Sequence, residues 1–230
     1  MKIVPSEIAL DAMCEVARSA LPPSTPRAVV VYGSFGRNQQ RPSSDLDVLF
    51  VGARSAGALE ALTEGLVDFS RRNCLTLDEE VPYANKLLAD WDELSTASTC
   101  AMFAGSPRLT PVRRTDQAYL ASSYMRRRLF VTGVLAQRTL SWSENAPLLE
   151  ALQARAGAGL IGAAIDDLRS AGVAVDPDSV ISYVTGDAQG IPPEDWLGFE
   201  PDSLTRTHLR CLADQMLSRA KSSSELNFAT

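Results

Sequence analysis

Two aspartates separated by one residue, Asp45 and Asp47, stand at the start of the apolar stretch Leu46–Val51. On a β-strand, residues two positions apart point to the same face, so the two carboxylates would lie side by side. Neighbouring carboxylates among apolar residues are costly unless a positive charge lies between them. Because Mg²⁺ prefers oxygen ligands, the pair predicts a site for a divalent cation. For any single Asp-x-Asp the alternative is a turn residue followed by a solvent-facing one.

A Gly-Ser pair precedes these aspartates by 12 positions, directly after the apolar run Ala28–Tyr32. Gly33 permits a sharp turn after a strand and a close approach of a ligand to the backbone. Ser34 offers a hydroxyl and a main-chain N–H to a phosphate. If the residues 35–40 form a helix, the phosphate would sit at its N-terminus, where unpaired N–H groups favour an anion. Arg37 either adds a charge-assisted contact or faces solvent.

A Gly-Ser turn followed a dozen residues later by an Asp-x-Asp strand resembles the signature of the nucleotidyltransferase superfamily. The superfamily is DNA-polymerase-β-like and includes the aminoglycoside and the minimal nucleotidyltransferases. The resemblance covers about residues 28–90. It implies an α+β fold, in which a polymerase-β-like mixed sheet with flanking helices precedes a mainly helical C-terminal domain. It also implies a nucleoside triphosphate as co-substrate and Mg²⁺, as two ions, bound by Asp45 and Asp47.

The resemblance further implies a third carboxylate on a neighbouring strand, which we place in Leu75–Val81. Strand alternation puts Asp78 and Glu80 on one face and Glu79 on the other. We favour Glu80, as a general base or a further metal ligand, because the following Val81-Pro82 places it at the strand end. Asp78 stays open, and an acidic strand edge is the alternative for either residue. The nucleotide is expected to contact Gly33, Ser34, Arg37, Ser44 and Lys86, although Lys86 could instead pair with an acidic neighbour.

The elements that must position these residues follow from periodicity. Helices are expected where apolar residues recur at helical spacing, with Ser6 as the N-cap of the first, and strands in short apolar runs. The predicted helices are 8–20, 56–73, 85–91, 118–136, 147–168 and 204–221, and the predicted strands are 28–32, 46–51 and 75–81. Two domains are expected, a nucleotidyltransferase domain over 1–115 and a helical acceptor-binding domain over 116–230.

Composition restricts the partners. The formal net charge is −6 and only 7% of residues are aromatic, which disfavours a long nucleic acid as acceptor compared with a small molecule or a protein. The basic runs Arg113-Arg114 and Arg126–Arg128 fit solvated helix faces. Four scattered cysteines without a CxxC pair argue against zinc and against a disulfide framework. Without an evident signal peptide or an apolar run long enough for a bilayer, we expect a cytoplasmic protein with no membrane partner.

We therefore expect an enzyme that transfers a nucleoside monophosphate, with AMP as the first choice, to a hydroxyl of a small-molecule acceptor, as in antibiotic modification. One alternative is an antitoxin-like enzyme that AMPylates a protein. Another is a nucleotide-binding regulatory domain that has lost catalysis. Two other features carry no function: His208, the single histidine, is expected at a surface, and Gly157–Gly162 is expected to pack helices closely rather than to bind a dinucleotide.

Overall fold

The computed structural model of the chain describes residues 3–55, 57–76, 87–98, 123–137, 139–170, 172–185 and 203–226. The chain forms two compact units, one of residues 1–95 with 138–152 and one of residues 96–137 with 153–230. The predicted domain boundary at residue 115 lies outside the described residues and stays a prediction. The first unit also takes in residues 138–152, which lie in the half of the chain expected to be helical.

The first unit is built on a four-stranded mixed sheet in the order β3-β2-β1-β4. The central strand β1 (Ala28–Val31) is antiparallel to β2 (Val48–Val51) and to β4 (Leu140–Ser143). The short strand β3 (Leu88–Ala89) pairs with β2 in parallel. A mixed sheet with flanking helices confirms the predicted α+β class.

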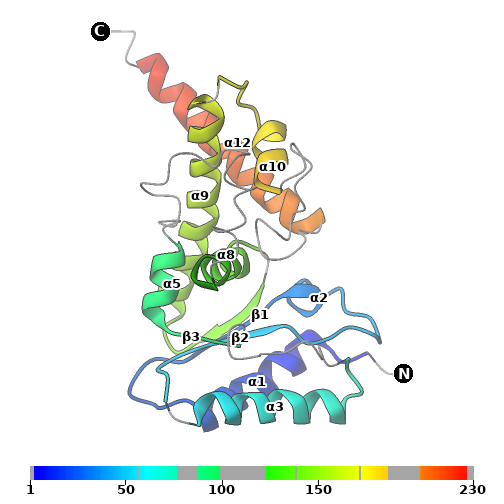
Figure 1. The fold of residues 1–230 in the computed structure, drawn as a ribbon. Coiled ribbons are helices and arrows are strands. Elements are labelled where there is room, and N and C mark those ends of the chain that lie inside the picture. The colour runs from blue at the N-terminus through cyan, green and yellow to red at the C-terminus, as the bar shows by residue number, and fades with distance from the viewer. Residues whose placement is uncertain are drawn as a thin grey trace. The chain divides into compact units, whose positions relative to one another are not determined.

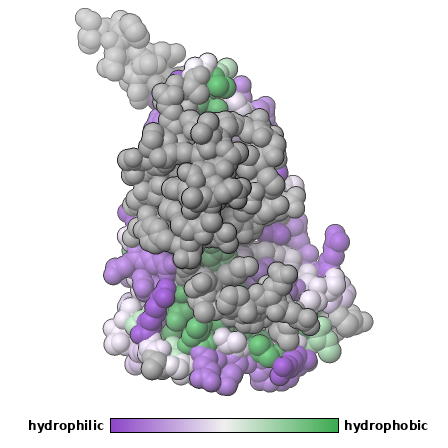
Figure 2. Space-filling view, viewed as in Figure 1, coloured by the Kyte–Doolittle hydropathy of each residue, from purple (hydrophilic) through white to green (hydrophobic). Residues whose placement is uncertain are grey.

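Two helices, α1 (Ser6–Ala20) and α3 (Ala58–Arg72), lie side by side against the same face of this sheet (Figure 1). Every residue of β1 and β2 is buried, which explains why both strands read as continuous apolar runs rather than alternating ones. The core joins the sheet to the inner faces of the helices through Met13, Ala17, Val29, Val31, Phe35, Phe50, Leu62, Leu66 and Phe69. Hydrophilic residues and smaller apolar areas alternate on the visible face of the described residues (Figure 2).

The region after α3 differs from the predicted strand at 75–81 and helix at 85–91. Thr76 forms an isolated parallel bridge with Asp45, and residues 77–86 lie outside the described part of the chain. Leu88–Ala89 is a strand and not helical, and α5 (Trp91–Ser98) begins only after it. The reason is tertiary: both residues are buried beside Phe50 and Val51, the edge of β2 that β1 leaves open.

Strand β4 joins the edge of β1 through an ion pair between residues far apart in sequence. The Nε of Arg27 lies 3.1 Å from both carboxylate oxygens of Glu144, and the main-chain N–H of Arg27 donates to Glu144 Oε2 at 2.9 Å. The Glu144 N–H donates back to the Arg27 carbonyl at 2.9 Å. Beside them, the Arg18 guanidinium lies 4.6 Å from the ring centroid of Trp142. These contacts add to the pairing of β4 with β1.

This ion pair predicts a pH dependence of stability. The hydrogen bonds from the Arg27 side chain and main chain lower the pKa of Glu144 below its ordinary value. A carboxylate with a lowered folded pKa stabilises the fold above its ordinary pKa, about 4.3, and that stabilisation is lost as the pH falls through the lowered value. Urea unfolding at pH 7 should therefore show Glu144→Gln to be less stable than the wild type. As the pH falls through the lowered pKa of Glu144, the difference in stability between the two proteins should shrink.

A matched control for this comparison is Glu150→Gln, because Glu150 is an exposed glutamate a few residues further along the chain. Its difference from the wild type should be small throughout this pH range. A deficit for Glu144→Gln that stays constant as the pH falls until the carboxylate is protonated would contradict the role of its charge.

The second unit is helical, with α8 (Ser123–Ala136), the larger part of α9 (Ala146–Ser170), α10 (Pro177–Thr185) and α12 (Ser203–Leu226). Its core is formed by apolar residues of these four helices, including Ala136, Ile161, Val180, Val184 and Leu209. A Cβ on Gly157 would come within 2.9 Å of Leu212 Cδ1, which supports close packing of α9 against α12 at this glycine.

One helix among the described residues is long and apolar enough to cross a membrane by length and composition. The segment is Ala146–Asp166 of α9, with a mean hydropathy of 1.2 over an 18-residue stretch, 47% of which is buried. Its buried side chains include Leu160, Ile161 and Ile165, which belong to the core of the second unit. The core helix of a protein that meets no membrane has the same properties.

Candidate nucleotide-binding site

The Gly-Ser turn lies where β1 ends. The Tyr32 N–H donates to the Asp47 carbonyl at 3.1 Å, and Gly33 then turns the chain with φ of 61°. The helix that follows, α2 (Gly33–Gly36), begins at the glycine itself and is shorter than the predicted helix over residues 35–40. It ends early because Asn38 takes a left-handed conformation, with φ of 58°.

The carboxylate of Asp47 lies directly against Gly33. A Cβ placed on Gly33 would come within 2.0 Å of Asp47 Oδ2 and 2.9 Å of its Cγ. Glycine is needed here twice, because its φ is positive and because no side-chain atom fits between the turn and the carboxylate. The structure thus brings together Gly33 and Asp47, two of the residues predicted from the sequence.

Ser34 presents a hydroxyl that the described residues leave without a hydrogen bond. Its Oγ is buried and has no partner among them. Buried polar atoms nearly always have a partner, so such an atom calls for an explanation. A phosphate oxygen at this turn is one ligand that would accept from it. The Ser34 carbonyl is satisfied within the turn by the Gln39 N–H at 2.8 Å.

Asp45 lies at the same end of the sheet as the turn. Both aspartates precede β2, which begins at Val48, and β1 and β2 are antiparallel, so the start of β2 meets the end of β1. Asp45 and Asp47 are half-buried. Thr76 holds its own segment beside Asp45, because its hydroxyl donates to the Ser43 carbonyl at 2.9 Å. Sequence reasoning missed Thr76, since a lone threonine at a strand start carries no signal.

Ser44, which we expected at the nucleotide, holds the turn before Asp45. The Arg41 N–H donates to Ser44 Oγ at 2.9 Å, and the Ser44 N–H donates to the Arg41 carbonyl at the same distance. The hydroxyl oxygen is thus used inside the protein, while its own proton can still be donated to a ligand. Ser44 therefore shapes the loop that delivers the aspartates.

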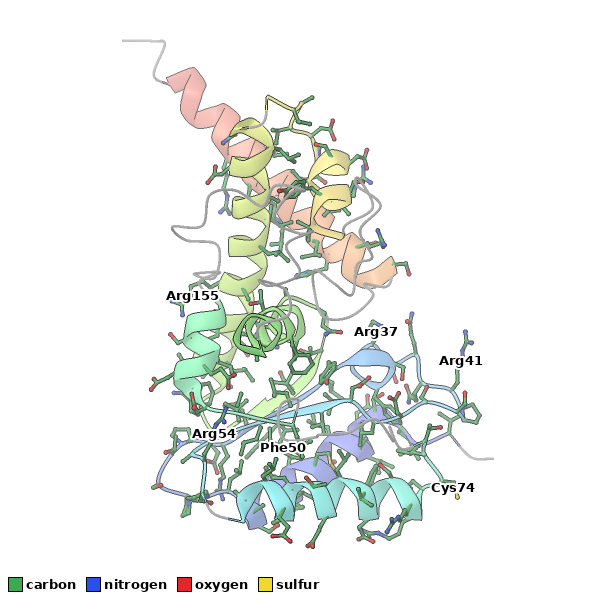
Figure 3. All side chains as sticks on the ribbon, in the orientation of Figure 1. Arg37, Arg41, Phe50, Arg54, Cys74 and Arg155 are labelled. Carbon is green, nitrogen blue, oxygen red and sulfur yellow. The ribbon has the colours of Figure 1, made fainter. Side chains whose placement is uncertain are left out.

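Two arginines, Arg37 and Arg41, lie at the end of the sheet where the Gly-Ser turn is found (Figure 3). Figure 3 shows Arg37 and Arg41 beside α2, with Arg54 at the opposite end of the sheet. Arg54 is engaged there by Glu93, 3.0 Å from its Nη2, and by Asp90 at 3.6 Å from its Nε. Arg37 is half-buried at the C-cap of α2 and Arg41 is exposed.

Several predicted residues are not placed by the structure. Asp78, Glu80 and Lys86 lie outside the described residues. Among the residues that are described, no group of three His, Cys, Asp or Glu could hold a metal ion, so the pair Asp45 and Asp47 is the described part of the predicted ligand set. His208 is exposed on α12.

A buried thiol in the first unit can be set aside. Cys14 lies in the core on α1, and burial raises its pKa to about 11. A thiol with such a pKa is protonated near neutral pH and is a poor nucleophile. Cys14 is therefore not a candidate nucleophile for this site.

Residues 13–89 match the family model described as a nucleotidyltransferase domain. This chain carries a nucleotidyltransferase domain. The match spans α1 from Met13, the Gly-Ser turn, both aspartates and α3, and it stops at the last residue of β3. Strand β4 and the start of α1 lie outside it. No curated protein and no solved structure gives a significant match.

Proposed function

We propose that this nucleotidyltransferase domain transfers a nucleoside monophosphate, first of all AMP, from a nucleoside triphosphate to a hydroxyl of a small molecule. One observation carries the proposal: the Asp47 carboxylate packs on the Gly33 backbone beside the buried Ser34 hydroxyl, which has no partner among the described residues. A turn with a buried hydroxyl donor and a carboxylate in contact with its backbone suits a triphosphate with its counter-cation.

The reaction is a displacement at the α-phosphorus. The acceptor oxygen forms a new bond to that phosphorus, the bond to the oxygen bridging to the β-phosphate breaks, and pyrophosphate leaves with the electron pair. The acceptor proton passes to a carboxylate or to solvent. The Gly33-Ser34 turn would bind the leaving phosphates through the Ser34 hydroxyl and N–H, and Arg37 would add charge to the same end.

The donor set fits Mg²⁺. Asp45 and Asp47 supply carboxylate oxygens, and the Asp47 oxygens reach the phosphate turn without an intervening side chain. When bound, the metal would neutralise charge on the triphosphate during the displacement. Other residues of the protein hold the two aspartates in place. Thr76 and Ser44 fix the loop around Asp45, and Gly33 fixes Asp47.

The third carboxylate stays a choice between Asp78 and Glu80, with Glu80 preferred for its place before Pro82. Asp78→Asn and Glu80→Gln separate the two. The variant that loses turnover but keeps nucleotide affinity identifies the residue that accepts the acceptor proton.

A small-molecule acceptor is supported by the net charge of −6 and by the length of chain that follows the family match at residue 89. The charge disfavours a polyanionic acceptor. The helical second unit provides apolar packing of its own and is the natural candidate for contacts with the acceptor. Antibiotics with free hydroxyls are the first class to try.

Pyrophosphate release tests the proposal. The full chain is incubated with each of four nucleoside triphosphates and Mg²⁺, against a panel of hydroxylated small molecules that includes aminoglycosides. Acceptor-dependent pyrophosphate release, together with a product heavier by one nucleoside monophosphate, is expected. Release only with a co-expressed protein would indicate a protein-AMPylating enzyme. Nucleotide binding without release for any acceptor would indicate a regulatory domain.

A further inference from the structure

A buried serine at the start of α1 forms hydrogen bonds with the segment that follows the Gly33-Ser34 turn. Ser6 is 1% exposed and is the first residue of α1, yet its hydroxyl does not cap that helix. It donates to the carbonyl of Phe35 at 2.8 Å. Gln40 Oε1 and Asn38 Oδ1 lie 3.1 Å and 3.3 Å from the same hydroxyl oxygen. One side chain thus meets three residues of the segment that follows Ser34.

A second hydrogen bond links the segment after Ser34 to the residues just before α1. Gln40 Nε2 donates to the carbonyl of Val4, at 2.8 Å. Within the segment, the Asn38 N–H donates to the Phe35 carbonyl at 3.0 Å, so that this carbonyl accepts from both the turn and Ser6. The bond to Ser6 therefore ties the interior of the turn to α1.

The turn needs such support because its helix is short and the non-glycine residue Asn38 has a positive φ. Gly33 and Asn38 both have positive φ, at 61° and 58°, and α2 between them is a single turn of four residues. A left-handed non-glycine residue persists only where its surroundings hold it. Ser6 provides that hold from outside the segment, and it lies outside the residues 13–89 that match the family.

We infer that Ser6 is a positioning residue that presets the Gly33-Ser34 turn for a triphosphate, an inference that rests on the proposed function. Ser6 does not reach the ligand itself. It keeps the Ser34 hydroxyl and N–H aimed for phosphate, so that binding does not have to order the turn.

Amide hydrogen exchange of the full chain, without any ligand, tests whether Ser6 stabilises the turn. Ser6→Ala should speed exchange of the amides in residues 34–39 on the order of ten-fold, the effect of losing one hydrogen bond. The matched control is Ser19→Ala, which removes a hydroxyl bond of similar length from the other end of the same helix, 2.9 Å to the Val16 carbonyl. Equal exchange in the two variants would overturn the inference. If Ser6→Ala fails to fold, Ser6→Cys keeps the shape with a weaker donor and takes its place.

Binding of the fluorescent ATP analogue mant-ATP, with Mg²⁺, tests whether Ser6 raises the affinity for a triphosphate. Ser6→Ala should weaken affinity on the order of ten-fold, while Ser19→Ala should bind as the wild type does. The double variant with Ser34→Ala should lose less affinity than the sum of the two single losses, since Ser6 acts in part through the Ser34 hydroxyl. Additive losses, or unchanged affinity in Ser6→Ala, would overturn the role of Ser6. A wild-type chain that does not bind the probe would overturn the proposed function instead.

Discussion

Replacing Asp47 with asparagine is expected to lower nucleotidyl transfer by about 10³-fold or more while leaving the fold intact. The amide keeps the shape that packs against Gly33 but cannot offset the charge of a cation. Two carboxylates two positions apart repel each other in the absence of metal, so removing one charge should not weaken the apo fold. Mg²⁺-dependent pyrophosphate release measures the first effect, and thermal unfolding without Mg²⁺ measures the second.

The matched control for that variant is Asp11→Asn, an exposed carboxylate on α1 of the same unit. It removes the same charge from the unit without touching the site, and it should leave turnover unchanged. A large loss of thermal stability in Asp47→Asn without Mg²⁺ would contradict the metal site and indicate a structural role for this carboxylate. Retained turnover would remove Asp47 from the mechanism.

The centre of the site could be predicted from the sequence because its signals are local. A glycine after an apolar run predicts a turn, and the structure has that turn at Gly33, with the Asp47 carboxylate against it. That alternation places Asp45 and Asp47 on one face stays a prediction. The predicted length of the helix after Gly33 was wrong, because nothing in the sequence shows that Asn38 adopts a positive φ and ends α2.

The supporting contacts could not be predicted, since they depend on pairs distant in the chain. Ser6 was expected to cap its own helix, but its hydroxyl binds Phe35, and Pro5 occupies the N-cap position. Strand β4 has a polar, short sequence and becomes a strand by pairing with β1, next to the contact of Arg27 with Glu144 across 117 positions. Short segments take their structure from tertiary partners more than from their own propensity.

Replacing Gly33 with alanine is expected to be the most damaging single change in the first unit. The new Cβ would meet the Asp47 carboxylate at 2.0 Å, and the alanine would have to adopt a positive φ. The backbone alone costs about 1–2 kcal/mol, and forcing the carboxylate aside adds about 1–3 kcal/mol. The thermal unfolding midpoint should fall by several degrees, and pyrophosphate release should be lost because Asp47 leaves the phosphate turn.

Gly57→Ala separates the cost of the positive φ from the cost of the clash with the carboxylate. Gly57 has φ of 79°, and no atom lies within 4 Å of the place that a Cβ would take, so this variant carries the backbone strain without the clash. It should lose about 1 kcal/mol and keep its turnover. Adding Asp47→Ala to Gly33→Ala should restore part of the lost stability, since the Cβ then has room, whereas turnover stays absent. If Gly33→Ala and Gly57→Ala lose equal stability and both remain active, the contact between the turn and the Asp47 carboxylate does not organise the site.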